Sequence, residues 1–476
     1  MDGYKSDISD ESEKGLNEKE EKYYAIKRKE DPKQETKEPG FDDIWDIEVS
    51  GSIGSSAFLY NDTIYFGGCD QYVYALDLDG KMKWQYRTGG VVISSPTIVD
   101  DKLFVASFDG FIYCLSADNG KLLWKYKTGN KIVDSPVIVG DRIYIGGGDN
   151  FFYSLSFDGD LLWKFEADGP FDTTAAVAND MIFIGSKDKN MYCLSDDGSL
   201  QWKFPAFNHI FTSPILVDKN SISSFRQRCH KKSPTVKDGS VLFGSLDKNI
   251  YSVSLDGKLL WKKMFDGAPL SAPFASNGSV YFGSLDRHLY ALTLNGDFRW
   301  KFESGGPIIS SPFIHNNVVY FGSFDKNFYA VSTEGETLWK FNTGGIVGSS
   351  PIIHKNMIIF GSMDTFLYAL DMDTRDVLWT FQTGQGFQSN VKRNINVITE
   401  FDKKIFKVWK PETRGASGSV DASQRGYKGK VDVPEGLTYG GERTYSSSNP
   451  AYTGGGSYHS KRDKKKNKFG PKWMDM

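Results

Sequence analysis

Short apolar runs separated by turn residues follow one another along most of the chain. Between Ser94 and Lys127, four such runs are separated by Asp-Asp, Asp-Gly and Asp-Asn-Gly. Asp-Gly and Asn-Gly pairs between apolar runs are typical of hairpins, so the stretch predicts four antiparallel strands in a meander. The predicted strands are residues 94–99, 103–107, 111–116 and 122–127.

One tryptophan in each stretch gives the period of the pattern. Successive tryptophans are 39 or 40 residues apart, with one longer interval of 59. A period of this length is typical of a blade array or a solenoid, and tandem four-stranded meanders predict an all-β propeller. The tryptophans are Trp45, Trp84, Trp124, Trp163, Trp202, Trp261, Trp300, Trp339 and Trp379.

An aspartate keeps the same register in eight units, with a tyrosine four residues after it. A glycine also precedes the tryptophan by four residues, except in the last unit, which has Arg375. An aspartate carboxylate can bond backbone N–H groups two residues on, and eight equivalent copies indicate a structural role. The indole rings are expected in the seams between neighbouring blades. The aspartates are Asp70, Asp109, Asp149, Asp188, Asp247, Asp286, Asp325 and Asp364.

The two ends of the repeat leave the blade count open. Eight complete units span residues 51–385, a strand with Trp45 precedes them, and residues 401–408 resemble residues 324–331. Propellers usually have four to eight blades. We therefore predict eight blades, with the N- and C-terminal segments sealing the ring and removing its exposed edges. A nine-bladed ring is the alternative.

Composition divides the chain into a propeller and two tails. The propeller is expected over residues 41–410, between a charged segment at 1–40 and a Gly-, Ser- and Tyr-rich segment at 411–476. Both tails are predicted to be disordered. The net charge of −3 gives the whole chain no field that would attract nucleic acid. Without a visible signal peptide, membrane span or Cys-x-x-Cys pair, a cytoplasmic location with free thiols is expected.

The unit from Ser311 to Gly344 contains Ser-Pro, Tyr-Phe-Gly-Ser-x-Asp, Tyr-Ala and Gly-x-x-x-Trp in a fixed order. It resembles the repeat of pyrroloquinoline-quinone-type propellers, and the resemblance covers about residues 43–409. That family includes quinone-dependent alcohol dehydrogenases and the BamB-like assembly lipoproteins, which are not enzymes. The resemblance therefore implies the fold and leaves the function open.

The channel residues disfavour a quinone enzyme. In the family, the first strand of each blade lines the central channel, and here those stretches offer hydroxyls, Asp134 and Asp172, with Lys131 as the nearest base. A cofactor with three carboxylates needs cationic partners. The dehydrogenases also carry a disulfide between adjacent cysteines, which this sequence lacks. We predict no cofactor, catalytic or metal-binding residue; a quinone-dependent or small-ligand-binding propeller is the alternative.

Two basic segments outside the repeat are candidate contacts. The first is an insertion in unit five, residues 219–238, with Arg226, Arg228, Lys231 and Lys232, although a solvated loop would have the same composition. The second is the end of the C-terminal tail, with Lys464, Lys465 and Lys466. The sequence predicts a propeller scaffold that mediates protein–protein interactions in a larger assembly; an RNA-associated protein acting through the tail is a further alternative.

Overall fold

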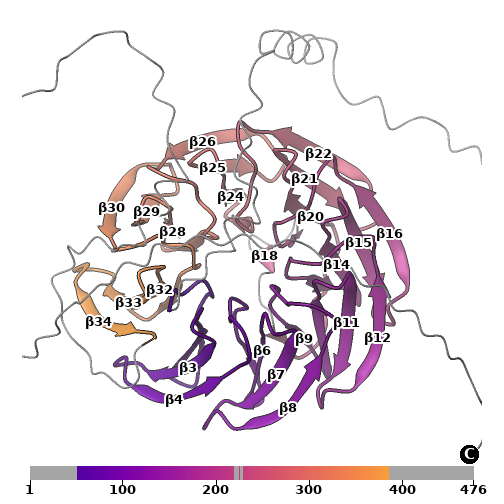
Figure 1. The fold of residues 1–476 in the computed structure, drawn as a ribbon. Coiled ribbons are helices and arrows are strands. Elements are labelled where there is room, and N and C mark those ends of the chain that lie inside the picture. The colour runs from indigo at the N-terminus through magenta and orange to yellow at the C-terminus, as the bar shows by residue number, and fades with distance from the viewer. Residues whose placement is uncertain (1–50, 219–223, 226–228, 385–476) are drawn as a thin grey trace, which may run out of the picture. The chain divides into compact units, whose positions relative to one another are not determined.

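Eight blades, each built on four antiparallel strands, stand around a ring in the computed structural model (Figure 1), and in two of the blades a short extra strand adds to the sheet. The structure describes residues 51–218, 224–225 and 229–384, all within the first of two compact units, Met1–Pro411. These residues form strands and turns, with no helix among them. The four strands of each blade pair in chain order, and in blade five the insertion separates the first strand from the second. The prediction of an all-β propeller is confirmed, with eight blades.

Each blade has an innermost strand at the channel and an outermost strand at the rim. The innermost strands are β1 (Phe58–Tyr60), β5 (Thr97–Val99), β9 (Val137–Val139), β13 (Ala176–Ala178), β17 (Ile215–Asp218), β23 (Phe274–Ser276), β27 (Phe313–His315) and β31 (Ile352–His354). The second strands are β2 (Thr63–Gly67), β6 (Lys102–Ala106), β10 (Arg142–Gly146), β14 (Met181–Gly185), β20 (Gly239–Gly244), β24 (Ser279–Gly283), β28 (Val318–Gly322) and β32 (Met357–Gly361). The third strands are β3 (Tyr72–Asp77), β7 (Phe111–Ser116), β11 (Phe151–Ser156), β15 (Asn190–Ser195), β21 (Asn249–Ser254), β25 (His288–Thr293), β29 (Asn327–Ser332) and β33 (Phe366–Asp371). The outermost strands are β4 (Met82–Arg87), β8 (Leu122–Lys127), β12 (Leu161–Glu166), β16 (Leu200–Pro205), β22 (Leu259–Met264), β26 (Phe298–Glu303), β30 (Thr337–Asn342) and β34 (Val377–Gln382). Two short extra strands, β18 (Ser224–Phe225) and β19 (Cys229–His230), belong to the insertion.

The innermost strands are shorter than the sequence pattern suggests. Residues 94–99 were expected to form one strand, but β5 begins only at Thr97. Pro96 has no N–H to donate to a ladder. Ser94 accepts a bond from the N–H of Ala106, and the N–H of Ser95 donates to the next blade. The start of each innermost stretch is therefore used for links rather than for strand pairing.

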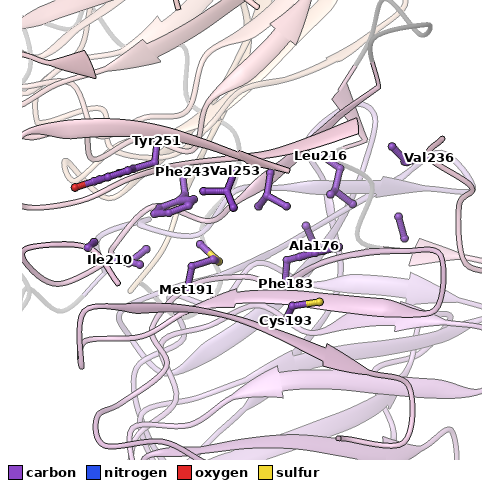
Figure 2. Close-up of a cluster of buried hydrophobic side chains, with 13 residues drawn as sticks. Ala176, Phe183, Met191, Cys193, Ile210, Leu216, Val236, Phe243, Tyr251 and Val253 are labelled. Carbon is purple, nitrogen blue, oxygen red and sulfur yellow. The ribbon is translucent and has the colours of Figure 1, made fainter. Parts of the chain in front are cut away.

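The hydrophobic core consists of layers between neighbouring blades. One cluster joins Tyr65 and Val73 of blade one to Leu103 and Leu115 of blade two. Figure 2 shows the corresponding layer between blades four and five, where Phe183 and Phe243 face each other's sheets. Since every blade is buried on both faces by its neighbours, the ring is held together by eight similar apolar layers.

The ring closes between blades eight and one. The indole N–H of Trp379 donates to the carbonyl of Leu78 at 2.8 Å, and the N–H of Gly384 donates to Asp70 at 2.8 Å. The hydroxyl of Thr383 donates to the carbonyl of Gly51. These contacts repeat those of the other seams. Among the described residues, the ring therefore closes with all four strands of blade eight coming from one continuous segment. The strand with Trp45 and residues 401–408, predicted to seal the ring, lie outside the described residues.

Candidate functional site

The repeated aspartate links each blade to the blade before it. One oxygen of Asp109 accepts the N–H of Phe111 at 3.0 Å; the other accepts the hydroxyl of Tyr113 at 2.5 Å and the N–H of Gly89 at 2.7 Å. Burial is the larger cause and the hydrogen bond to the Asp109 carboxylate the second cause of a raised pKa for Tyr113, so the phenol stays a neutral donor. The same set of three bonds occurs at Asp70, Asp149, Asp188, Asp247, Asp286, Asp325 and Asp364.

The repeated tryptophan lies in the seam with the following blade. The N–H of Trp84 donates to the carbonyl of Ala117 at 2.9 Å, and its ring covers Gly120, which has a φ of 71°. The same N–H to carbonyl bond is made by Trp124, Trp163, Trp202, Trp261, Trp300 and Trp379. The structure thus places these residues in contacts between blades rather than in a catalytic arrangement.

The hydroxyls at the channel are used by the backbone. Within a blade, the hydroxyl of Ser349 accepts the N–H of Gly361 at 2.7 Å. Between blades, the N–H of Ser56 donates to the hydroxyl of Ser95 at 2.9 Å, and the N–H of Ser95 donates to the hydroxyl of Ser135 at 3.0 Å. Further links of this second kind join Thr174 to Ser213, Ala272 to Ser311, Ser311 to Ser350 and Ser350 to Ser56. The serine hydroxyls of the second kind therefore connect neighbouring blades by hydrogen bonds.

Asp134 takes one of these hydroxyl positions in blade three. It is 3% exposed and accepts the N–H of Gly146 at 2.9 Å, as Ser349 does from Gly361. Burial raises the pKa of Asp134 to about 8, and the carboxylate of Asp172 adds to the rise. A buried carboxyl with that pKa is largely protonated near neutral pH.

Asp172 is paired with a lysine that the sequence analysis did not identify. Its carboxylate lies 2.7 Å from the amine of Lys187, which comes from the turn after β14. Lys131 was expected to be the nearest base, but its amine lies over the ring of Phe108, 5.3 Å from the centroid. The expectation for Lys131 is therefore wrong at Asp172, whose partner is Lys187, 15 residues further along the chain, in the turn after β14.

These residues do not fit a pyrroloquinoline quinone. The three carboxylates of that cofactor need cationic partners, but the channel stretches contribute hydroxyls and two acids, and the amine of Lys187 is already paired with Asp172 at 2.7 Å. Among the described residues, no group of three or more His, Cys, Asp or Glu side chains is arranged to hold a metal ion. We derive no chemical step through such a cofactor.

The described part of the unit-five insertion, residues 229–238 (hereafter the strap), lies across neighbouring blades. Strand β19 pairs in parallel with β9 of blade three, and the N–H of Gly140 donates to the carbonyl of His230 at 2.9 Å. In blade four, the side chain of Asn179 donates to the carbonyl of Val236 at 2.7 Å and accepts its N–H at 2.9 Å. The strap thus ties blades three, four and five together.

Both short strands of the insertion pair with innermost strands, β19 with β9 and β18 with β17. Strand β18 pairs antiparallel with β17 and lies near the centre of the ring in Figure 1. Val236 is 2% exposed and belongs to the layer between blades four and five, next to Ala176 and Leu216 (Figure 2). Lys231 and Lys232 are exposed on this strap. The other candidate contacts, Arg226, Arg228, Lys464, Lys465 and Lys466, lie outside the described residues.

The connection from blade four to blade five also has an exposed aromatic residue that the sequence analysis missed. Phe207 is 74% exposed, and its N–H donates to Asp247 at 2.9 Å. In the other seven units the equivalent donor is a glycine or Asp168. The amine of Lys262 lies 5.1 Å from the centre of the Phe207 ring, and Leu260 and Met264 are exposed on the same strand, β22. Aligning the repeat at this position would have identified Phe207.

The part of the chain that the structure describes contains no helix long and apolar enough to cross a membrane.

The seams and turns define a closed eight-bladed propeller whose blades are joined by tryptophan contacts. The family model described as outer membrane protein assembly factor BamB matches residues 42–127, 69–174, 153–224, 221–311 and 295–407. The chain therefore belongs to this family. No curated protein matches the chain.

Three solved structures share the fold at 15% identity each. The computationally designed protein Ika8 has a TM-score of 0.56 and covers 68% of this chain and 97% of its own. BamB from Moraxella catarrhalis has a TM-score of 0.55 and covers 67% of this chain and 97% of its own. A europium-containing methanol dehydrogenase has a TM-score of 0.53, with 67% and 83% coverage. Because one neighbour is an enzyme, the fold alone does not decide the function.

Proposed function

We propose that the chain is a non-catalytic scaffold that binds protein partners on the faces and rim of its propeller, within a larger assembly. The observation that carries the proposal is the surface formed by Phe207 and strand β22 of blade five. Phe207 is exposed where six other units have glycine, and the centre of its ring lies 5.1 Å from the amine of Lys262 on β22. The same strand carries Leu260 and Met264, which are 45% and 49% exposed. Exposed aromatic and methionine side chains with a neighbouring cation are typical of contact sites between proteins.

The arrangement of the channel supports the same proposal. A quinone enzyme would need cations and metal ligands that converge on a free space. Here the hydroxyls bond the backbone, and the amine of Lys187 is 2.7 Å from the carboxylate of Asp172. The name of the matched family, an assembly factor, is consistent with a binding role for this chain.

The scaffold is tested at Phe207. Proteins recovered with the intact chain are compared with those recovered with F207G, which restores the residue of most other units and keeps the N–H bond to Asp247. The matched control is F298A, because Phe298 is also an exposed phenylalanine, at 50%, on another blade. We expect a partner protein that is recovered with the intact chain and with F298A but not with F207G. That partner, once purified, should bind the purified intact chain directly. Equal recovery by both variants would remove blade five as the contact.

The alternative function has its own test. Pyrroloquinoline quinone and calcium are added to the purified chain, and absorbance and dye-linked alcohol oxidation are measured. We expect neither a spectral change nor turnover. A stoichiometric spectral change with turnover would establish the dehydrogenase and overturn the scaffold.

The proposal includes a cytoplasmic location. Cys69, Cys114 and Cys193 are free thiols, and burial raises the pKa of each to about 12. Free thiols are typical of a reducing compartment. Fractionation of cells that produce the full chain, with an antibody against it, tests this location; recovery in a membrane or secreted fraction would contradict it.

A further inference from the structure

The outermost strand of blade eight differs from the other seven in charge. Each outermost strand bonds the third strand on one side and has its other edge at the rim. Proteins protect such edges with charged residues, especially lysine. Six of these strands have a lysine directly after the tryptophan, and β4 carries Lys83 and Arg87. Strand β34 reads Val-Leu-Trp-Thr-Phe-Gln, with no charged residue. The six lysines are Lys125, Lys164, Lys203, Lys262, Lys301 and Lys340.

The described chain begins beside the end of β34. The hydroxyl of Thr383, the residue after β34, donates to the carbonyl of Gly51 and to that of Thr365. In blade one, the hydroxyl of Thr88 donates in the same way to the carbonyl of Gly90. Gly51 therefore holds the place that Gly90 holds one blade later. The described chain thus starts next to the end of β34.

This correspondence gives residues 43–49 the register of an outermost strand. Trp45 stands six residues before Gly51, as Trp84 stands six residues before Gly90. The position of the outermost strand before blade one is already filled by β34. The segment thus has an outer-strand pattern, with Ile44, Trp45, Ile47 and Val49, and no vacant position among the four strands of that blade.

We propose that residues 43–49 add to the rim edge of β34 as a fifth strand. Because both segments lead toward the contact between Gly51 and Thr383, the proposed pair is parallel. The short tether gives the segment an effective concentration on the order of millimolar at this edge, above that of a second copy in solution. A covered edge also needs no lysine, which accounts for the uncharged sequence of β34. The inference is independent of the proposed function.

Hydrogen–deuterium exchange of the intact chain tests the proposal by comparing two strands of one molecule. A six-residue strand with one free edge leaves about half of its N–H groups without a strand partner. Strand β30 of blade seven, at residues 337–342, is the internal reference. We expect residues 377–382 to retain about three more slowly exchanging amides than residues 337–342. Equal exchange of the two strands would show a free edge and overturn the proposal, and this comparison needs no variant.

A proline variant then identifies the occupant. I47P removes a donor in the middle of the segment, and N17P places the same residue farther along the N-terminal tail. In I47P, residues 377–382 should exchange as residues 337–342 do, while blades two to seven keep their protection. In N17P the native pattern should remain. Protection of β34 that survives I47P would overturn the proposal, and protection that falls on dilution would show a second copy as the occupant.

Discussion

The tryptophan seam can be tested by adding one methyl group at Gly120. A Cβ there would lie 2.5 Å from Cε3 of Trp84, at a φ of 71°. Gly278, in the turn between β23 and β24, has nearly the same φ of 72° and nothing within 4 Å of a Cβ. G120A and G278A therefore share the backbone cost and differ only in the contact with the indole.

The magnitudes follow from these two environments. An alanine in the left-handed region costs roughly 1–2 kcal/mol, so we expect about that loss in G278A. G120A must also displace Trp84, and inserting a methyl group into a packed site costs about 1–3 kcal/mol. Losing the 2.9 Å bond from the indole to Ala117 adds about 0.5–1.5 kcal/mol. G120A should thus be less stable than G278A by roughly 2–4 kcal/mol.

Urea unfolding of the purified chain measures the difference. Tryptophan fluorescence and far-UV circular dichroism are followed together, so that loss of a single seam can be told from loss of the ring. If the two variants unfold at the same urea concentration, the indole does not depend on the glycine, and the account of the seam is wrong.

Three further predictions concern other groups. The pKa of Asp134 is about 8 in the folded state, against an ordinary aspartate value of 3.8, so the native state binds the proton more tightly than the unfolded state does. The contribution of this proton to the free energy of unfolding is complete below pH 3.8 and is lost as the pH rises through 8. Melting curves between pH 4 and 9 should show this decline in the native chain and lose most of it in D134S, which restores the hydroxyl of other blades. N179A removes both side-chain bonds to the strap and should cost about 1–3 kcal/mol; faster exchange of residues 233–238, with blades six to eight unchanged, would show it, and unaltered exchange would refute it. Cys114 and Cys193 are fully buried, so a thiol reagent at pH 8 should modify them only after urea is added; rapid modification of the folded chain would contradict their placement in the core.

The repeat explains why the fold could be predicted from the sequence. Trp84, Asp109 and Gly120 each recur at one position in nearly every unit, and a contact that recurs must be made between neighbouring units. The strands at residues 111–116 and 122–127 have the predicted bounds. The start of β5 was wrong because Ser94 and Ser95 bond across blades, which a pattern of apolar residues does not reveal.

The candidate site depends on contacts outside the repeat, so the sequence predicted it less well. The pairing of Asn179 with Val236 joins residues 57 positions apart and has no local signal. The ion pair of Asp172 with Lys187 likewise depends on where a turn points. Phe207 could have been found from the sequence, because it replaces the glycine that most other units have at the aligned position. The importance of that position becomes clear only from the bond between the Phe207 N–H and Asp247.

The contact between Thr383 and Gly51 means that the circle has no natural first blade. A short linker from residue 384 to residue 51 would join the two positions, and the chain could be reopened at the turn of Asn277 and Gly278, where a Cβ at Gly278 meets no atom within 4 Å. Such a circular permutant would keep every seam between blades while changing the order in which the blades are synthesised. The linear order of the units is then a property of the polypeptide, whereas the assembled ring is cyclic.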